Sequence, residues 1–174
     1  MKTLQGNKIT LKALEPEDLD FLFRIENDES IWELSNTITP FSKALLKQYI
    51  ENAHLDIFQV KQLRLTIVEN TSVEQVGFID LFDFDPINLR AGIGIIIDDQ
   101  FQNRGFATEA LELLIEYSFV HLRIHQLFAN ITSDNLSSIK LFENNNFKAV
   151  GTKKDWISTP NGFKDEILYQ LINE

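Results

Sequence analysis

The sequence predicts a single mixed α/β domain, and three observations carry this prediction. The 174 residues suit one ordinary domain with a full hydrophobic core, and no repeat or break in composition divides residues 1–174. A content of 44% hydrophobic and 24% charged residues is typical of globular proteins. Segments with strand periodicity alternate with segments of helical periodicity in the order β-α-α-β-β-β-α-β-α-β-β.

The first third of the chain predicts a strand followed by two helices. Residues 8–14 alternate polar and apolar side chains, as a half-buried strand does. Residues 15–18 begin a helix, because Pro16 suits its first turn and the acids lie at its positive end. A second helix is predicted around 42–53, after a loop that contains Pro40.

The middle of the chain predicts three strands. Two of them, at 63–69 and 75–84, are joined by a polar turn. The third, at 91–97, is apolar, and we expect it to be buried on both faces. Because glycine weakens a strand, Gly92 and Gly94 suggest a bulge or a close approach by another backbone or a ligand.

The last third alternates helices and strands. Apolar residues recur at helical spacing from about 105 to 122, and a shorter helix is predicted at 135–144. Further strands are expected at 127–131, 147–152 and 166–171.

Composition excludes several classes of function. Sixteen Lys and Arg against 26 Asp and Glu give a net charge of −10, which disfavours nucleic acid and anionic membranes as partners. Such a surface attracts cations, including amines, although it also serves solubility alone. No apolar run reaches the roughly 18 residues that span a bilayer, and residues 1–6 contain no apolar stretch of a secretion signal. We therefore expect a cytoplasmic protein.

Metal and thiol chemistry are not expected. Cysteine is absent, which excludes disulfides, thiolate metal sites and a cysteine nucleophile. His54, His121 and His125 have neither ligand spacing nor acidic partners nearby, so no metal site is predicted.

The segment 102–107, between the glycine-containing strand and the long helix, predicts an anion site. Gly105 and the small Ala107 at a helix start let backbone N–H groups approach a ligand at the positive end of the helix dipole. The segment lacks the Lys-Ser/Thr of a nucleotide-triphosphate loop and the three-glycine dinucleotide fingerprint. A pyrophosphate held by backbone amides remains, with an ordinary strand-to-helix turn as the alternative.

Two matched segments resemble the GNAT superfamily of acyl-coenzyme A-dependent N-acyltransferases. Gln102, Gly105 and Ala107 match its signature after a central strand, and 135–143 with Asn146-Phe147 match the Asn, short helix and Gly-Phe-like pair that follow. The resemblance implies a mostly antiparallel central sheet flanked by helices, with a splayed central strand. Acetyl-coenzyme A would lie in the resulting gap.

The resemblance also implies the residues that hold the coenzyme. Pantetheine would pair with the backbone of Ile95 and Ile97, and Asn135 would bond to it, whereas Arg104 and Lys140 would meet phosphates or serve only as surface charge. The full set of implied coenzyme contacts is Ile95, Ile96, Ile97, Gln102, Asn103, Arg104, Gly105, Phe106, Ala107, Thr108, Asn135 and Lys140.

Within the superfamily the chain is similar to two groups, the spermidine/diamine N-acetyltransferases and the ribosomal-protein alanine N-acetyltransferases. The runs 89–97 and 156–165 carry this similarity. We expect direct acetyl transfer to a small primary amine, with polyamines first. The alternatives are a protein N-terminus as acceptor, or a coenzyme-binding module without turnover. Relatives of this kind often form dimers, so the resemblance also implies a homodimer as one state.

The catalytic groups depart from the family pattern. An amine with a pKa near 10.4 must lose a proton before it attacks, which costs roughly 4.6 kcal/mol at pH 7. Phe142 replaces the Tyr that protonates the thiolate in many relatives, and Ser138 is the expected substitute. Gly92 replaces a frequent Glu, so the base is sought at the neighbouring strand end, where we favour Asp83. Ordered water is the alternative proton acceptor, and a free N–H of Ile95 or Ile96 is the expected oxyanion donor.

Acidic residues near the N-terminus suggest the acceptor side. Trp32 and Glu29 are expected to line the acceptor pocket together with Asp80. A solvated helix face explains the acids of 15–33 nearly as well. The loop 35–40 contains no acid, unlike the corresponding loop in polyamine enzymes, which speaks against polyamine regulation.

Overall fold

The computed structural model describes residues 2–35 and 37–174. Met1 and Asn36 lie outside the described residues, so the predictions for the segment 1–6 and the loop 35–40 fall partly outside them.

One seven-stranded sheet organises the protein, in the order β1-β2-β3-β4-β5-β7-β6. Among the strands of the described residues, only the β4–β5 pair is parallel, which confirms the predicted mixed, mostly antiparallel sheet. The strands are β1 (Ile9–Ala13), β2 (Leu63–Glu69), β3 (Gln75–Asp85), β4 (Arg90–Ile97), β5 (Gln126–Thr132), β6 (Lys148–Thr159) and β7 (Gly162–Ile172).

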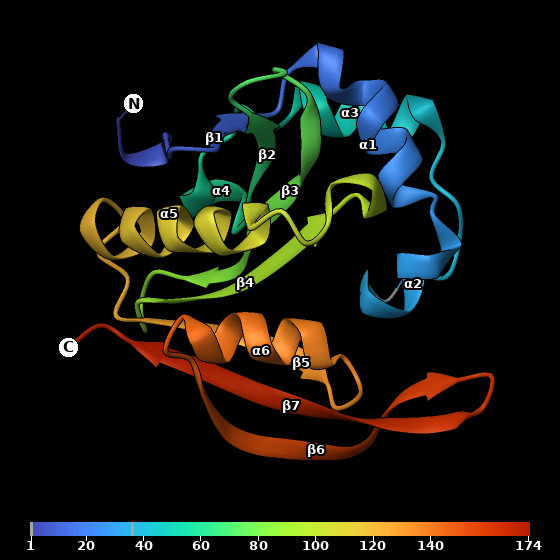
Figure 1. The fold of residues 1–174 in the computed structure, drawn as a ribbon, viewed down its shortest axis with the longest axis vertical. Coiled ribbons are helices and arrows are strands. Elements are labelled where there is room, and N and C mark those ends of the chain that lie inside the picture. Colours follow the sequence, from blue (N-terminus) through green and yellow to red (C-terminus); the bar gives the residue numbers. More distant parts are fainter. Residues whose placement is uncertain (1, 36) are drawn as a thin grey trace.

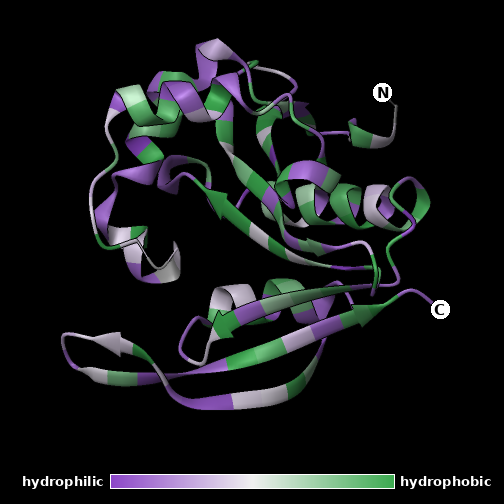
Figure 2. Cartoon of the chain, turned by 180° about the vertical axis from the view of Figure 1, so that it is seen from behind, coloured by the Kyte–Doolittle hydropathy of each residue, from purple (hydrophilic) through white to green (hydrophobic). Residues whose placement is uncertain are grey.

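Helices cover both faces of the sheet. In Figure 1, α1 and α3 lie together at the top, α5 runs in front of the sheet, and α6 lies over β5 and β7. The helices are α1 (Leu19–Glu26), α2 (Glu29–Ser35), α3 (Lys43–Glu51), α4 (Ile57–Val60), α5 (Phe106–Val120) and α6 (Leu136–Asn144). The apolar residues of α5 and α6 join one core cluster, and those of α1 and α3 join a second around Phe78. Figure 2 shows hydrophilic residues prominent along the outer strand β6.

Strand β4 leaves its neighbour halfway along. It pairs with β5 only from Arg90 to Gly92, whereas its pairing with β3 extends to Ile97. Strand β5 turns instead toward β7 and pairs with it along its whole length. The expected splay of the central strand is therefore present, with the gap open along 93–97.

Several sequence predictions need correction. Helices α2 and α4 were not predicted, because each is too short to display a helical repeat. The expectation that 91–97 is buried on both faces holds for 91–93 but is wrong for 94–97, which are half-buried along the gap. Strands β6 and β7 are about twice as long as predicted, since cross-strand pairing in a hairpin stabilises exposed polar residues that carry no periodic signal.

No helix among the described residues is long and apolar enough to cross a membrane.

Candidate active site

A cradle of free backbone amides forms where β4 leads into α5. Asn103 and Gly105 both adopt left-handed conformations, with φ of 60° and 83°. The backbone N–H groups of 103–108 form no hydrogen bond with any described residue. Because these donors lie at the positive end of a 15-residue helix, they make a site for an anion such as a pyrophosphate.

Several side chains around this cradle already form hydrogen bonds within the protein. Gln102 donates to Asp99 Oδ1 at 2.7 Å, and Arg104 donates to the Gln100 carbonyl at 3.0 Å. The Lys8 ammonium donates to the Arg104 carbonyl at 3.0 Å, which brings a cation beside the cradle. Sequence reasoning missed Lys8, because the contact joins segments almost a hundred residues apart and no local pattern signals it.

The gap between β4 and β5 holds a cavity of about 140 Å³. The cavity combines predicted residues from two elements, namely Ile95 of β4 and Asn135 and Ser138 at the start of α6. The remaining lining residues are Glu33, Ile93, Gly94, Ala129, Asn130, Ile131, Thr132, Phe142, Ile157 and Glu166. The other predicted coenzyme residues, from Gln102 to Thr108, lie in the cradle, and Lys140 is exposed on α6.

Asn135 orients the start of α6 and faces the cavity. Its Oδ1 accepts hydrogen bonds from the Ser138 backbone N–H at 3.1 Å and from the Ser137 hydroxyl at 3.0 Å. The Asn135 amide NH₂ has no partner among the described residues, so it remains available to a ligand.

Two family positions are filled by phenylalanine rings. Phe142 is 3% exposed and packs edge-on against Phe147, with 5.0 Å between ring centroids. A Cβ at Gly92 would collide with the Phe82 ring, which explains this glycine as a close approach of a side chain. The ring of Phe82 in turn packs edge-on against Phe128. The ring of Phe142 therefore takes the place of the Tyr of the family pattern, and the ring of Phe82 fills the space beside Gly92, where the pattern has a Glu.

The structure does not bring Asp83 to the cavity. Asp83 is exposed, with φ of 48°, at the irregular step in the β3–β4 register. That step lies beside Arg90, where β4 and β5 are still paired, and therefore at the closed end of the gap. The role of Asp83 as base stays a prediction.

Asp80 takes part in a half-buried ion-pair network. Arg64 donates to both Asp80 oxygens, at 2.6 and 3.0 Å, and also to Glu26. Burial by itself would lower the pKa of Arg64, but Asp80 and then Glu26 outweigh burial and raise this pKa above its usual value. A substrate cation would have to displace Arg64 to reach Asp80.

Helix α2 lies beside the cavity but turns different residues to it than expected. Trp32 donates its indole N–H to the Glu26 carbonyl at 2.9 Å, and Glu29 is exposed in the first turn. Glu33 lines the cavity instead and pairs with Lys164 of β7. Lys164 also pairs with Asp134 at 2.7 Å, which lowers the pKa of Asp134 and raises that of Lys164.

Two further polar side chains were missed by sequence reasoning. Glu166 is 7% exposed, and its Oε1 accepts from Lys153 at 2.6 Å. Thr132, its cross-strand partner, is also 7% exposed, and its hydroxyl has no hydrogen-bond partner in the described part of the chain. Only the pairing of β5 with β7 puts the two residues into one cavity, so no local signal points to them.

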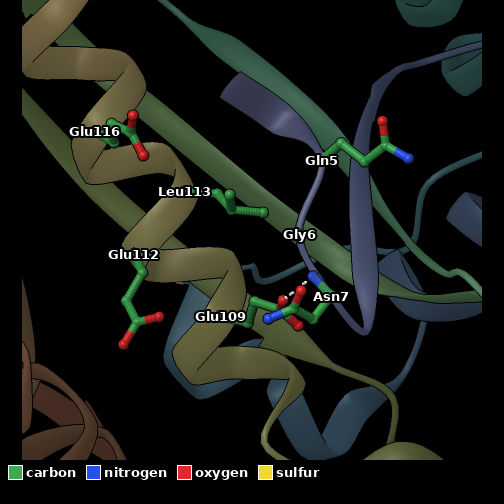
Figure 3. Close-up of a pocket in the computed structure, with 7 residues that line it drawn as sticks. All are labelled: Gln5, Gly6, Asn7, Glu109, Glu112, Leu113 and Glu116. Atoms are coloured by element: carbon green, nitrogen blue, oxygen red, sulfur yellow. Dashed lines mark hydrogen bonds between the residues drawn. The ribbon is translucent and has the colours of Figure 1, made fainter. Parts of the chain in front are cut away.

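A larger open groove lies elsewhere, between the N-terminal segment and the outer face of α5. It measures about 590 Å³ and is acidic, with Glu109 bonded to the backbone of Asn7 and Lys8 (Figure 3). The groove contains no predicted site residue. Across residues 2–35 and 37–174, no group of three or more His, Asp or Glu is placed to hold a metal ion.

Comparisons with known proteins agree with this geometry. The family of the acetyltransferase (GNAT) domain matches residues 8–148. An uncharacterized N-acetyltransferase p20 from Bacillus licheniformis is 28% identical over 173 residues, covering 99% of this chain and 97% of the relative. Spermidine N(1)-acetyltransferase from Vibrio cholerae is 26% identical over 151 residues, covering 84% and 82%.

Solved structures share the fold. Spermidine N-acetyltransferase from Vibrio cholerae in complex with CoA and spermine superimposes with a TM-score of 0.87 at 22% identity, covering 96% of each chain. A putative ribosomal-protein-serine acetyltransferase from Vibrio cholerae gives a TM-score of 0.75 at 20% identity, covering 98% and 97%.

The splayed sheet, the amide cradle and the family match define an acetyltransferase of the GNAT class. This chain belongs to the GNAT acetyltransferase family and is an acetyl-CoA-dependent N-acetyltransferase that acts on an amine.

Proposed function

We propose that the acceptor is a small cationic primary amine, with polyamines the first class to test. The observation that carries the proposal is one cavity, beside the open edge of β4, that holds Ser138 and two carboxylates, of Glu33 and Glu166. The volume of about 140 Å³ suits an acetyl group and an amine rather than a folded polypeptide.

The coenzyme is proposed to run from the cradle into the gap. The free N–H groups of 103–108 would hold its pyrophosphate, with Gln102 beside them, and Lys8, Arg104 and Lys140 are the nearby or exposed cations for its phosphates. The unpaired edge of Ile95, Ile96 and Ile97 would pair with pantetheine, as would the free amide of Asn135.

In the proposed reaction, the neutral amine attacks the thioester carbon directly in a ternary complex. A backbone N–H of Ile95 or Ile96, free on the side where β5 is absent, stabilises the negative charge on the thioester oxygen. Ser138 donates a proton to the leaving thiolate, since it lines the same cavity and Phe142 has no proton to give.

Charge supports a cationic acceptor. The net charge of −10 raises the local concentration of cations, and the relative that acts on spermidine is 26% identical over most of the chain. Glu29, Trp32 and Asp80 keep their proposed place on the acceptor side, although Asp80 acts through Arg64 rather than as a free carboxylate.

A protein N-terminus is the second candidate acceptor. It is favoured by the pairing of the acceptor-side acids with the chain's own cations: Glu26 and Asp80 with Arg64, Glu33 with Lys164, and Glu166 with Lys153. A polycation would compete with each of these pairs, whereas an N-terminal amine carries a single charge. The homodimer stays a prediction.

Radiolabelled acetyl transfer to a panel of amines tests the proposal. Spermidine, spermine and diamines are compared with peptides bearing N-terminal Ala and Ser at equal concentration. We expect a higher kcat/KM for a small amine than for any peptide. Preference for a peptide would support the second candidate, and CoA binding without transfer to any acceptor would indicate a non-catalytic binding module.

A further inference from the structure

We infer that Thr132 and Glu166 form the subsite that binds and deprotonates the acceptor amine. This inference rests on the proposed function, since it names residues that would receive the amine in the same cavity.

The hydroxyl of Thr132 is a buried polar group without a well-formed hydrogen bond. Its oxygen is shielded from solvent and forms no hydrogen bond of good geometry with any described residue, although a poorly formed side-chain hydrogen bond to Asp134 contributes to the lowered pKa of that carboxyl. An unsatisfied buried hydroxyl costs about 1–3 kcal/mol. Because Thr132 lines the cavity, a ligand that occupies the cavity would remove this cost.

Glu166 supplies the charge that a cation needs beside this hydroxyl. The two residues are directly opposite each other on β5 and β7, so their side chains leave the sheet on the same face. Lys153 binds only Oε1 of Glu166, and Oε2 has no hydrogen-bond partner among the described residues. A free carboxylate oxygen and a free hydroxyl oxygen together accept two N–H groups of a primary ammonium.

These contacts define the path of each proton in the proposed reaction. The ammonium gives one proton to Glu166, and its nitrogen lone pair then attacks the thioester carbon while Thr132 still accepts an N–H. The C–S bond breaks, the amide nitrogen gives its second proton to Ser138, and Ser138 gives its own hydroxyl proton to the leaving thiolate. The proton held by Glu166 then leaves to solvent, so one net proton is released per acetyl transfer.

Ser138 and Glu166 line the same cavity, and Gly94 and Ile95 of β4 line it as well. The acid, the base and the open strand edge therefore surround one space. This arrangement places a carboxylate base in the cavity, where Gly92 has no side chain and which Asp83 does not line.

The test compares T132V, T132S and E166Q with wild type, using T152V as a control at an exposed threonine of β6. Steady-state kinetics are measured with the best amine of the panel, acetyl-CoA affinity by calorimetry, and thermal unfolding on the free proteins. T132V should raise the KM for the amine about tenfold, and T132S should restore it. E166Q should lower kcat about a hundredfold. All four variants should bind acetyl-CoA like wild type.

Stability provides a readout that does not need turnover. Since the Thr132 hydroxyl has no well-formed hydrogen bond, T132V should unfold at the wild-type temperature or above it. A lower unfolding temperature would show that the hydroxyl bonds within the protein, for instance to Asp134, and would overturn the inference.

The two proposals fail in different ways. A wild-type enzyme that acetylates small amines while T132V keeps the wild-type KM, or E166Q the wild-type kcat, overturns the subsite and leaves the proposed function intact. A wild-type protein that acetylates no small amine overturns both.

Discussion

At the scale of single residues, the site depends on a few positions where backbone geometry or a missing side chain decides the chemistry. Gly105 has φ of 83° and opens the amide cradle, and a Cβ there would lie 3.0 Å from the Lys8 ammonium. Asn146, with φ of 67°, takes the left-handed position after α6 where relatives place glycine.

Replacing Gly105 by alanine should weaken coenzyme binding. The left-handed conformation costs a residue with a Cβ about 1–2 kcal/mol, and relief of that strain would move the amides. We expect G105A to bind acetyl-CoA about tenfold more weakly by calorimetry. The matched control is G151A, where a Cβ meets nothing within 4 Å and no change is expected. Equal affinity in G105A and wild type would contradict the cradle.

Replacing Ser138 by alanine should slow turnover without loss of coenzyme. A positioned proton donor contributes about a hundredfold or more, so kcat should fall by roughly that factor while the Kd of acetyl-CoA stays constant. S137A is the control, because Ser137 is exposed and bonds only to Asn135. Full activity in S138A would remove Ser138 from the mechanism.

At the scale of elements, α2 is the most weakly attached helix beside the cavity. It has seven residues, and none of its described side chains is fully buried. A helix this short is marginal without tertiary contacts. Three contacts among the described residues hold it: Ile31 packs against the second core cluster, the Trp32 indole donates to the Glu26 carbonyl, and Glu33 pairs with Lys164.

Removing the Lys164 contact should loosen α2. We expect K164M to increase amide hydrogen exchange in residues 29–35, with α5 unchanged. K154M is the control, because Lys154 pairs with Asp165 in the same hairpin but away from α2. Unchanged exchange in K164M would mean that the contacts of Ile31 and Trp32 fix the helix without the ion pair.

The same contact makes the stability of α2 depend on pH. The pKa of Lys164 is raised, so the contribution of its pair with Glu33 is present below the ordinary lysine pKa and is lost as pH rises through the raised value. The pKa of Asp134 is lowered, but Asp134 pairs with Lys164 outside α2, so this shift does not bear on the helix. After correction for intrinsic exchange rates, protection of α2 should be constant near neutral pH and fall at high pH.

At the scale of the whole molecule, the gap divides one sheet into two parts joined by three residue pairs between β4 and β5. The coenzyme would bridge both parts, because the cradle belongs to α5 whereas Asn135 and Ser138 belong to α6. Binding should therefore stabilise the whole domain.

Acetyl-CoA at a hundred times its Kd should raise the free energy of unfolding by about 2.7 kcal/mol. For a domain of this size, the Tm should rise by roughly 5–10 °C in thermal unfolding. G105A at the same ligand concentration is the control and should show a smaller rise. A single concentration-independent Tm would contradict binding in the gap.

The sequence predicted most of this architecture, and its failures have physical causes. The free-amide turn before α5 and the helix cap Asn135 are local features, since helix caps depend on neighbouring residues, and the structure contains both. Lys8, Thr132 and Glu166 were missed, and the pairing of Asp80 with Arg64 was not predicted. All of these depend on a residue far away in the sequence. Asp80 pairs with Arg64, Lys8 donates to the Arg104 carbonyl, and Thr132 lies opposite Glu166 across the β5–β7 pair.

By itself the sequence determined the order of the main elements, the free-amide turn before α5 and the family. These features depend on periodicity and helix capping, which involve residues close together in the sequence. Only the tertiary structure decided which acids are free and which are neutralised, that Phe82 fills the space beside Gly92, and that Thr132 and Glu166 face one cavity. Charge pairing and burial depend on distances in space, which the spacing of residues along a chain does not encode.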